Sequence, residues 1–265
     1  LKKFFNFKKK VVLITGCNGQ VGQAIINLFS RLDSIVYGID VTKPKSKYNF
    51  NFIKCDITNQ KSLKKTIEKI IHKEKTIDIL INNAGISTFT NFKKRTEKEL
   101  DKIFKTNVVS VINLIKHYVI MFDKKKLKKG KIINISSIYG FLSPDFKIYS
   151  KGDRFSPEIY GASKSSIIQL TKYYAVLLAK RKINVNCISP GGLLNKKLQS
   201  NGFISRYKKR VPMNRMGQSS DLLTTIIFLA SDSTEYVTGQ NIIVVITIYK
   251  IEKQFTNSLA MMLHN

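Results

Sequence analysis

The sequence predicts one α/β domain in which a parallel β-sheet carries helices on both faces. Short β-branched and apolar runs alternate with longer amphipathic stretches along most of the 265 residues. This alternation is typical of βαβ units, whose crossover helices cover a parallel sheet. No internal repeat, low-complexity linker or Pro/Gly-rich boundary interrupts it. We therefore expect a single doubly wound, Rossmann-like domain over residues 1–265.

The expected elements follow directly from this alternation. Strands are expected at 11–15, 35–40, 77–82, 131–136, 183–189 and 242–249, with a further strand just before Cys55. Helices are expected at 21–31, 61–74, 96–122, 158–180 and 221–231. In a sheet of this kind ligands bind beyond the carboxyl ends of the strands, so functional residues are expected just after each strand.

Cysteine usage and hydropathy indicate a protein of the cytoplasm. Cys17, Cys55 and Cys187 lie far apart and form neither a Cys-x-x-Cys pair nor a Cys/His cluster, which predicts free thiols and no metal site. Residues 1–10 are basic and aromatic but lack the apolar stretch of a signal peptide, and no later run reaches the length of a membrane span. No membrane partner is expected.

The chain is strongly basic, with 46 Lys and Arg, 17 Asp and Glu, and a formal net charge of +29. A basic stripe would indicate nucleic-acid binding, but these residues are spread over nearly every segment. The one dense cluster, 124–131, falls where a helix should give way to a strand, so we expect a solvated turn there. Abundant Asn, Ile and Phe suggest a bias toward A/T-rich codons. Nucleic-acid binding is therefore not expected as the main role.

Three glycines follow the first expected strand. They lie in Thr15-Gly16-Cys17-Asn18-Gly19-Gln20-Val21-Gly22, which leads directly into a helical pattern. Glycines let a backbone turn tightly, approach a pyrophosphate and point free helix N–H groups at it. Gly16, Asn18, Gly19, Val21 and Gly22 are therefore expected to bind a dinucleotide. A plain strand-to-helix turn is the alternative.

Two acidic residues follow the next strands. Asp40 closes the second strand, where a carboxylate can bind the adenosine ribose hydroxyls and repel a 2′-phosphate, which predicts NAD in preference to NADP. Lys43 nearby would soften that repulsion. Asp56 and Ile57 follow the third strand, where they are expected to meet the adenine. The alternative for Asp56 is a helix cap with Thr58.

A Tyr and a Lys four residues apart, Tyr160 and Lys164, share one face of an expected helix. The pattern alone carries little information, because Tyr249 and Lys253 repeat it. Only the first pair follows a glycine loop and two further polar loops in order, so its context favours Tyr160.

Six motifs in order resemble those of the short-chain dehydrogenase/reductase family, from about residue 10 to residue 240. They are the glycine loop, Asn82-Asn83-Ala84-Gly85, Asn107, Ile135-Ser136-Ser137, Tyr160 with Lys164, and Asn184-Val185-Asn186-Cys187-Ile188-Ser189-Pro190-Gly191. The resemblance implies hydride transfer between a nicotinamide and a carbonyl or alcohol carbon. It also implies cofactor contacts at Asn83, Ala84, Gly85, Tyr160, Lys164, Pro190, Gly191 and Leu193.

The resemblance assigns the catalytic roles to Asn107, Ser137, Tyr160 and Lys164. A free phenol loses its proton only near pH 10, whereas a general acid/base works best near the operating pH, so its anion must be stabilised. Lys164 can supply the positive charge, and Ser137 can hydrogen-bond the substrate oxygen. By the family's pattern, Lys164 also holds the nicotinamide ribose and Asn107 supports a water. Taken singly, each residue has an ordinary structural explanation.

The chain departs from the family pattern in three places. The glycines are spaced as in the extended members of the family. Between Ser137 and Tyr160 lie 22 residues, about ten more than usual, and this insertion is expected to overhang a substrate pocket closed by a mobile lid at 195–215. After Val245 the usual Asp-Gly-Gly is missing, as a frameshift near residue 246 would produce, so 246–265 form an atypical tail.

Three functions remain open on this basis. The first is an NAD(H)-dependent oxidoreductase of a keto or hydroxyl carbon, with a sugar or sugar derivative as one substrate class. The insertion, the Pro-Gly-Gly motif at 190–192 and residues 210–217 look similar to those of members from bacterial surface-sugar and flagellin-modification pathways. The second is a 3-oxoacyl-[acyl-carrier-protein] reductase that uses NADPH. The third is a catalytically silent nucleotide- or RNA-binding protein. A homo-oligomer, dimer or tetramer, is expected by the resemblance.

Overall fold

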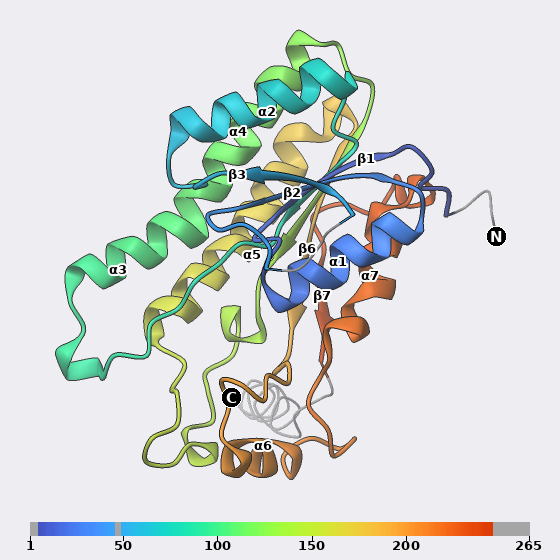
Figure 1. The fold of residues 1–265 in the computed structure, drawn as a ribbon. Helices are drawn as coiled ribbons and strands as arrows, with labels where there is room; N and C mark the ends of the chain where they lie inside the picture. The colour runs from blue at the N-terminus through green and yellow to red at the C-terminus, as the bar shows by residue number, and fades with distance from the viewer. Residues whose placement is uncertain (1–4, 46–48, 246–265) are drawn as a thin grey trace, which may run out of the picture.

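A computed structural model describes residues 5–45 and 49–245, which form a seven-stranded parallel sheet between two helical layers (Figure 1). The strand order is β3-β2-β1-β4-β5-β6-β7, and every neighbouring pair is parallel. The strands are β1 (Val11–Thr15), β2 (Ile35–Asp40), β3 (Asn51–Lys54), β4 (Ile79–Asn82), β5 (Gly130–Ile135), β6 (Ile183–Pro190) and β7 (Asn241–Val244). The predicted fold class is confirmed.

Helices cover both faces of this sheet (Figure 1). Residues of α2, α4 and α5 pack in the core of one face, and residues of α1 and α7 pack in the core of the other. The α-helices within the described residues are α1 (Gln20–Arg31), α2 (Gln60–Glu74), α3 (Glu97–Phe104), α4 (Ser110–Lys124), α5 (Glu158–Leu178), α6 (Asn201–Lys208) and α7 (Leu223–Ala230). The strands β1, β4, β5 and β6 are buried throughout, which explains why β1 and β4 are almost entirely apolar in the sequence.

The order of the strands reverses between β1 and β4, which pair in the middle of the sheet although β2 and β3 separate them along the chain. Crossovers leave the two sides of this point in opposite directions, so a crevice opens beyond the carboxyl ends of the strands. The glycine loop, the Asn82–Gly85 segment and Ser137 all follow strands at this edge.

Three expected elements differ from the structure. The helix expected at 96–122 is divided into α3 and α4 by one π-helical turn, Lys105–Val109. The lid expected as a loop contains α6, whose N-terminus is capped by Ser200 through the N–H of Phe203 (3.0 Å). The last strand is described only to Val244, and the expected residues 246–249 lie outside the described residues, as does the tail.

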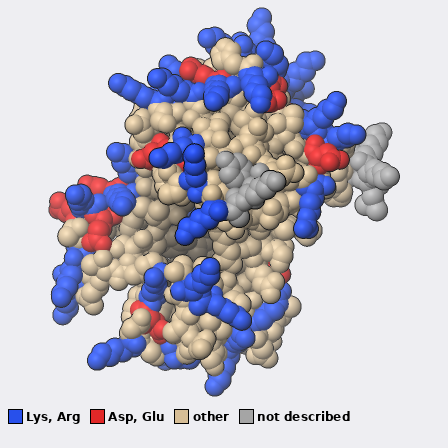
Figure 2. Space-filling model, viewed as in Figure 1, with Lys and Arg blue, Asp and Glu red and all other residues tan. Residues whose placement is uncertain are grey.

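The three cysteines are free and buried, and none of the described helices is both long and apolar enough to cross a bilayer. The basic side chains are distributed over the whole face shown in Figure 2, with a few carboxylates between them. This agrees with the scattered pattern seen in the sequence.

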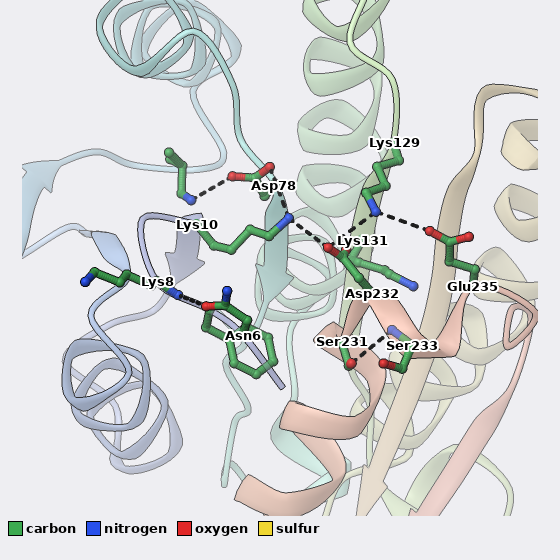
Figure 3. Close-up of polar contacts among 12 residues, drawn as sticks. Asn6, Lys8, Lys10, Asp78, Lys129, Lys131, Ser231, Asp232, Ser233 and Glu235 are labelled. Carbon is green, nitrogen blue, oxygen red and sulfur yellow. Dashed lines mark hydrogen bonds and ion pairs between the residues drawn. The ribbon is translucent and has the colours of Figure 1, made fainter. Parts of the chain in front are cut away.

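The solvated turn expected at 124–131 is wrong for its last residue. Lys131 belongs to β5 and is only 4% exposed, and its Nζ donates to Asn184 Oδ1 (2.9 Å) and to the carbonyl of Thr234 (3.3 Å). It lies at the amino-terminal edge of the sheet, away from the glycine loop, where Lys129 pairs with Asp232 (3.3 Å) (Figure 3). Burial lowers the pKa of Lys131 to about 8.

Candidate active site

Thr15, at the end of β1, joins the glycine loop to the loop after β4. Its hydroxyl oxygen accepts hydrogen bonds from the backbone N–H groups of Asn83 (3.0 Å) and Ala84 (2.9 Å). The side-chain amide of Asn83 donates in return to the carbonyls of Thr15 (2.9 Å) and Gly16 (3.1 Å). Hydrogen bonds in both directions therefore join the glycine loop to the loop after β4 at the switch point. Sequence reasoning had given no role to Thr15.

Close backbone contacts around the glycine loop leave no room for a side chain at Gly16 or Gly22. Gly16 has φ +65°, and a Cβ on it would lie 2.8 Å from Ala84 Cα. A Cβ on Gly22 would lie 2.2 Å from the carbonyl oxygen of Gly16, so the first turn of α1 packs directly on the loop. The unusual spacing of the glycines is thus compatible with a compact loop.

The N-terminus of α1 fits an anionic pyrophosphate. Gly19 is its N-cap and offers no side chain to the free N–H groups, and the first turn holds no acidic residue. Unpaired N–H groups and the helix dipole favour an anion at such an end. Gly16, Gly19, Val21 and Gly22 therefore suit the pyrophosphate of a dinucleotide, which would supply the hydride acceptor or donor.

Asp40 is held beside the glycine loop. Its carboxylate accepts from the backbone N–H of Asn18 (3.1 Å) and more weakly from that of Thr42 (3.4 Å), while the Asn18 amide donates to the Thr42 carbonyl (2.6 Å). The Asp40 carboxylate is therefore fixed against the glycine loop, and its contact with a ribose remains a prediction.

Asp56 makes the capping contact that the sequence left as the alternative. Its Oδ1 accepts from both the backbone N–H and the hydroxyl of Thr58, each at 2.8 Å. Ile57, 9% exposed, packs into the core under α2. Their contact with an adenine remains a prediction.

Tyr160 and Lys164 lie in the first two turns of α5, which starts after Pro157. Lys164 Nζ lies 5.6 Å from the centroid of the Tyr160 ring and donates to the carbonyl of Ile135 at the end of β5 (2.9 Å). The Lys164 side chain is part of the core, since the residue is only 5% exposed. The ammonium group is thus fixed beside the phenol by another strand.

Asn107 connects α5 to the loop after β4 from the π-helical turn. Its Oδ1 accepts from the N–H of Ile86 (2.8 Å), and its Nδ2 donates to the Ile86 carbonyl (2.9 Å) and to Ser163 Oγ (3.0 Å). Ser163 donates in turn to the carbonyl of Tyr160 (2.8 Å). Ser163 therefore links Asn107 to the backbone of the candidate acid/base, a role that sequence reasoning missed although Ser163 lies inside the motif.

Gly85 shows how closely these groups converge. A Cβ on Gly85 would lie 3.4 Å from both Asn107 Oδ1 and Lys164 Nζ. Groups from β4, the π-helical turn and α5 therefore meet at one point, as the order of the motifs predicts.

Ser137 follows β5 on the same edge. Its hydroxyl oxygen accepts from the N–H of Tyr139 (3.2 Å), and the residue is 8% exposed. The preceding Ser136 donates to the carbonyl of Lys164 (2.7 Å), which joins the end of β5 to α5. Ser137 is therefore positioned at the junction that also holds Lys164.

The Pro190–Leu193 segment at the end of β6 is bonded to its neighbours through backbone groups. The N–H of Gly191 donates to the Val244 carbonyl (3.0 Å), and the N–H of Gly192 donates to the Tyr207 hydroxyl (2.8 Å). A Cβ on Gly192 would lie 2.5 Å from the Tyr207 ring, so this motif packs directly under the lid.

The insertion and the lid are joined to each other. We call residues 141–157 and 195–215 together the cap. Asp153 accepts from Arg206 Nη2 (2.6 Å) and from the Ser200 hydroxyl (2.5 Å), and these contacts hold the pKa of Asp153 below its ordinary value, the hydroxyl contributing most. Tyr149 packs on Phe203 with centroids 5.3 Å apart. The insertion and the lid are therefore packed against each other as one unit.

Comparison with known proteins identifies the family. Residues 39–245 match the sequence model of a family described as enoyl-(acyl carrier protein) reductase, a match that covers most of the chain but starts after the glycine loop. The chain belongs to the short-chain dehydrogenase/reductase family. It is accordingly an oxidoreductase with a nicotinamide cofactor.

The curated relatives differ in their substrates. The chain is 33% identical to the 3-oxoacyl-[acyl-carrier-protein] reductase FabG of Buchnera aphidicola over 246 residues, which cover 89% of this chain and 95% of the relative. It is 31% identical to the 2-dehydro-3-deoxy-D-gluconate 5-dehydrogenase of Dickeya dadantii over 252 residues, covering 91% of this chain and 95% of the relative.

Solved structures agree on the fold. A short-chain dehydrogenase of Leptospira borgpetersenii with bound NAD⁺ is 39% identical, with a TM-score of 0.84 and coverage of 90% of this chain and 92% of that chain. Two further structures, each 27% identical, contain NADH and NADP respectively. The family therefore includes users of both cofactors.

Proposed function

We propose that this protein is an NAD(H)-dependent oxidoreductase in which Tyr160 exchanges a proton with the substrate oxygen. The observation that carries the proposal is the position of Lys164 Nζ, 5.6 Å from the centroid of the Tyr160 ring and bonded to the end of β5. In the proposed reaction this ammonium group supplies positive charge next to the ring whose hydroxyl exchanges the proton.

The remaining groups either bind the substrate oxygen or hold Tyr160 in place. Ser137, at the end of β5, donates a hydrogen bond to the substrate oxygen and stabilises the charge that develops there. Asn107 and Ser163 hold the backbone of Tyr160 and so keep the phenol aligned. In the oxidation of an alcohol, Tyr160 would take the hydroxyl proton while the nicotinamide of bound NAD⁺ would accept the hydride from carbon, and reduction of a ketone would reverse both transfers.

NAD is the cofactor that this proposal favours. The Asp40 carboxylate beside the glycine loop suits ribose hydroxyls and repels a 2′-phosphate. The Leptospira structure with NAD⁺ supports this choice, whereas the similarity to 3-oxoacyl reductases supports the alternative, an NADPH-dependent reductase of acyl substrates.

The substrate proposed is a ketone or alcohol of a sugar derivative. The Dickeya relative, named for a gluconate derivative, supports it. Tyr139, Tyr149 and Tyr207 also bring hydroxyl groups under the cap, with the first two 3.2 Å apart, and such groups suit a substrate with several oxygen atoms.

A cytoplasmic homo-oligomer, dimer or tetramer, completes the proposal. The three free thiols support a reducing compartment. Large apolar side chains on the outer face of α5, among them Val176 at 82% and Leu177 at 50% exposed, support a subunit contact there.

The cofactor choice is tested by Asp40→Ser. Wild type is expected to bind NADH about tenfold or more tightly than NADPH, and the variant to lose most of this difference because the repelling charge is gone. Fluorescence titration with both cofactors measures it, with Asp101→Ser, an exposed position on α3, as the matched control. Equal wild-type affinities would favour the NADPH-dependent alternative.

A further inference from the structure

A pocket lies between the insertion and the segment after β4, and we call it the outer pocket. Its volume is about 550 Å³, within the range of small-molecule sites. Its apolar walls come from two separate segments, Phe89 and Phe92 on one side and Pro144, Phe146, Phe155 and Pro157 on the other. Because the insertion supplies the second wall, the outer pocket is a property of this chain's longer loop.

The phenyl rings of the outer pocket are unusually exposed. Phe89 is 51% exposed, Phe92 73%, Phe146 59% and Phe155 44%. Single exposed apolar side chains are common, but several gathered around one concavity indicate a binding site. Phe155 stacks on Tyr149 (4.8 Å, 24°) and on Phe146 (6.4 Å, 28°), so one wall is already rigid. A flat ring could bind against it without further ordering of these side chains.

Cationic groups flank the same walls. Arg154 lies over the Phe89 ring, 4.8 Å from its centroid, and makes no ion pair with any acidic residue in the described chain. Arg95, whose side chain is only 7% exposed, lines the outer pocket, and its guanidinium pairs with Glu158 and donates to the Thr90 carbonyl (2.8 Å). Arg154 therefore leaves one uncompensated positive charge beside Phe89, and we call it the rim charge.

The outer pocket adjoins the candidate active site. Tyr139 and Gly161 line it, and they follow Ser137 and Tyr160 closely in the chain. A Cβ on Gly161 would lie 2.9 Å from the Tyr139 carbonyl oxygen, so the two segments are in direct contact. The outer pocket therefore lies next to the segments that carry Ser137 and Tyr160.

We propose that the outer pocket binds a flat ring that carries an anionic group, at the end of the substrate remote from the reacting carbon. The rings of Phe146 and Phe155 stack on the flat ring and Phe92 contacts it from the other wall, while Arg154 pairs with the anionic group. This assignment to the substrate rests on the proposed function. A nucleotide moiety and an aryl carboxylate share this chemistry, and the test separates them.

Binding of two probes, UMP and 3-phenylpropionate, tests the proposal by ligand-observed NMR on the full chain with saturating NAD⁺. Uridine and 3-phenylpropanamide serve as the uncharged analogues. Phe92→Ser removes one wall, and Arg154→Gln removes the rim charge. Tyr236→Ser and Lys61→Gln are the matched controls, since both positions are exposed and outside the outer pocket.

At least one probe is expected to bind wild type better than its uncharged analogue. Phe92→Ser should weaken that probe about three- to tenfold, the effect of losing one aromatic contact. Arg154→Gln should weaken the charged probe by a similar factor and leave its analogue unchanged. Preference for UMP identifies a nucleotide moiety, and preference for 3-phenylpropionate an aryl acid.

Two outcomes would overturn the proposal. One is that neither probe binds, or that both variants bind as the controls do, while the NADH titration is normal. The other is that Phe92→Ser changes only the sedimentation of the protein, which would make this face a subunit contact. Neither outcome touches the role of Tyr160, because no turnover is measured.

Discussion

At the scale of single residues, the candidate active site is held in place chiefly by bonds to backbone atoms. Lys164 donates to Ile135, Asn107 bonds both backbone groups of Ile86, and Ser163 bonds the carbonyl of Tyr160. Two of these partners belong to β5 and α5, and the loop that holds Ile86 is itself bonded to Thr15, so these side chains are preorganised for one geometry. Misplacing one of them should therefore slow the chemical step more than it weakens binding.

Ser163→Ala tests this positioning role. Loss of the bridge between Asn107 and Tyr160 should lower kcat about three- to tenfold, with little change in the substrate KM or in NADH affinity. Steady-state kinetics measure the split. Ser166→Ala is the matched control, because the Ser166 hydroxyl also bonds the preceding turn of α5, at the carbonyl of Ala162 instead of that of Tyr160. Equal effects of the two variants would contradict the assignment.

Lys131 gives a pH-dependent prediction at the opposite edge of the sheet. Its pKa is about 8 in the fold and 10.5 as the ordinary value, so between these pH values the unfolded chain binds more protons and stability rises with pH. Relative to Lys131→Met, wild type should gain about 1–2 kcal/mol between pH 7.5 and pH 9.5. Urea unfolding at several pH values measures this gain.

The exposed neighbour Lys128 provides the control for that experiment. Lys128→Met should keep the wild-type pH slope, because the substitution removes an exposed charge and leaves Lys131 buried. Parallel pH curves for wild type and Lys131→Met would show that burial does not depress the protonation of Lys131.

Residue identities at the site could be predicted because the sheet topology brings strand ends together. The roles of Tyr160, Lys164 and Asn107 were predicted from the resemblance to the family, and the topology explains how the segments that carry them come together. Partners that depend on the packing between elements could not be predicted. Ser163 and Thr15 act through contacts whose partners are 56 and 68 residues away in the chain, and a single hydroxyl gives no sign of such a partner.

At the scale of elements, the cap distinguishes this chain from the family pattern. The insertion and α6 are joined by a buried carboxylate, Asp153, whose side chain is 5% exposed, and by stacked rings. A buried charge of this kind is stabilised only while its partners remain in place. We therefore expect the insertion and α6 to move together, so that the lid opens and closes with the insertion attached.

Asp153→Asn should loosen the cap. Without the charge, Arg206 loses its ion pair, so the substrate KM should rise about three- to tenfold while kcat changes less than about twofold. Limited proteolysis within 195–215 should become faster. Asp33→Asn, at an exposed position remote from the cap, is the control. Unchanged KM and unchanged cleavage would show that the ion pair does not hold the cap.

The π-helical turn and α6 could not be predicted from the sequence, for a physical reason. The π-helical turn at Lys105–Val109 adds one residue to a turn and directs Asn107 inward, but the residues that form it have ordinary helical propensities. In the same way, α6 depends on packing against the insertion through Tyr149 and Phe203. Helical periodicity over eight residues is too short to predict such an element.

At the scale of the whole molecule, the two halves of the sheet have different tasks. The β1–β2–β3 half provides the glycine loop and Asp40, and the β4–β5–β6 half provides the polar groups around Tyr160. They meet at the switch point through Thr15 and Asn83. The net charge of +29 is spread over the surface, so it bears on solubility and on the attraction of anions rather than on the fold.

The central claim is that segments far apart in the chain meet around the phenol of Tyr160. Tyr160→Phe tests this claim most directly. The variant keeps the ring and removes only the oxygen, so NADH affinity measured by fluorescence titration should stay within about threefold of wild type. Turnover with a responsive substrate from a panel of sugar derivatives and secondary alcohols should fall by about 10²–10⁴. Full turnover in Tyr160→Phe would contradict the central claim that this phenol transfers the proton.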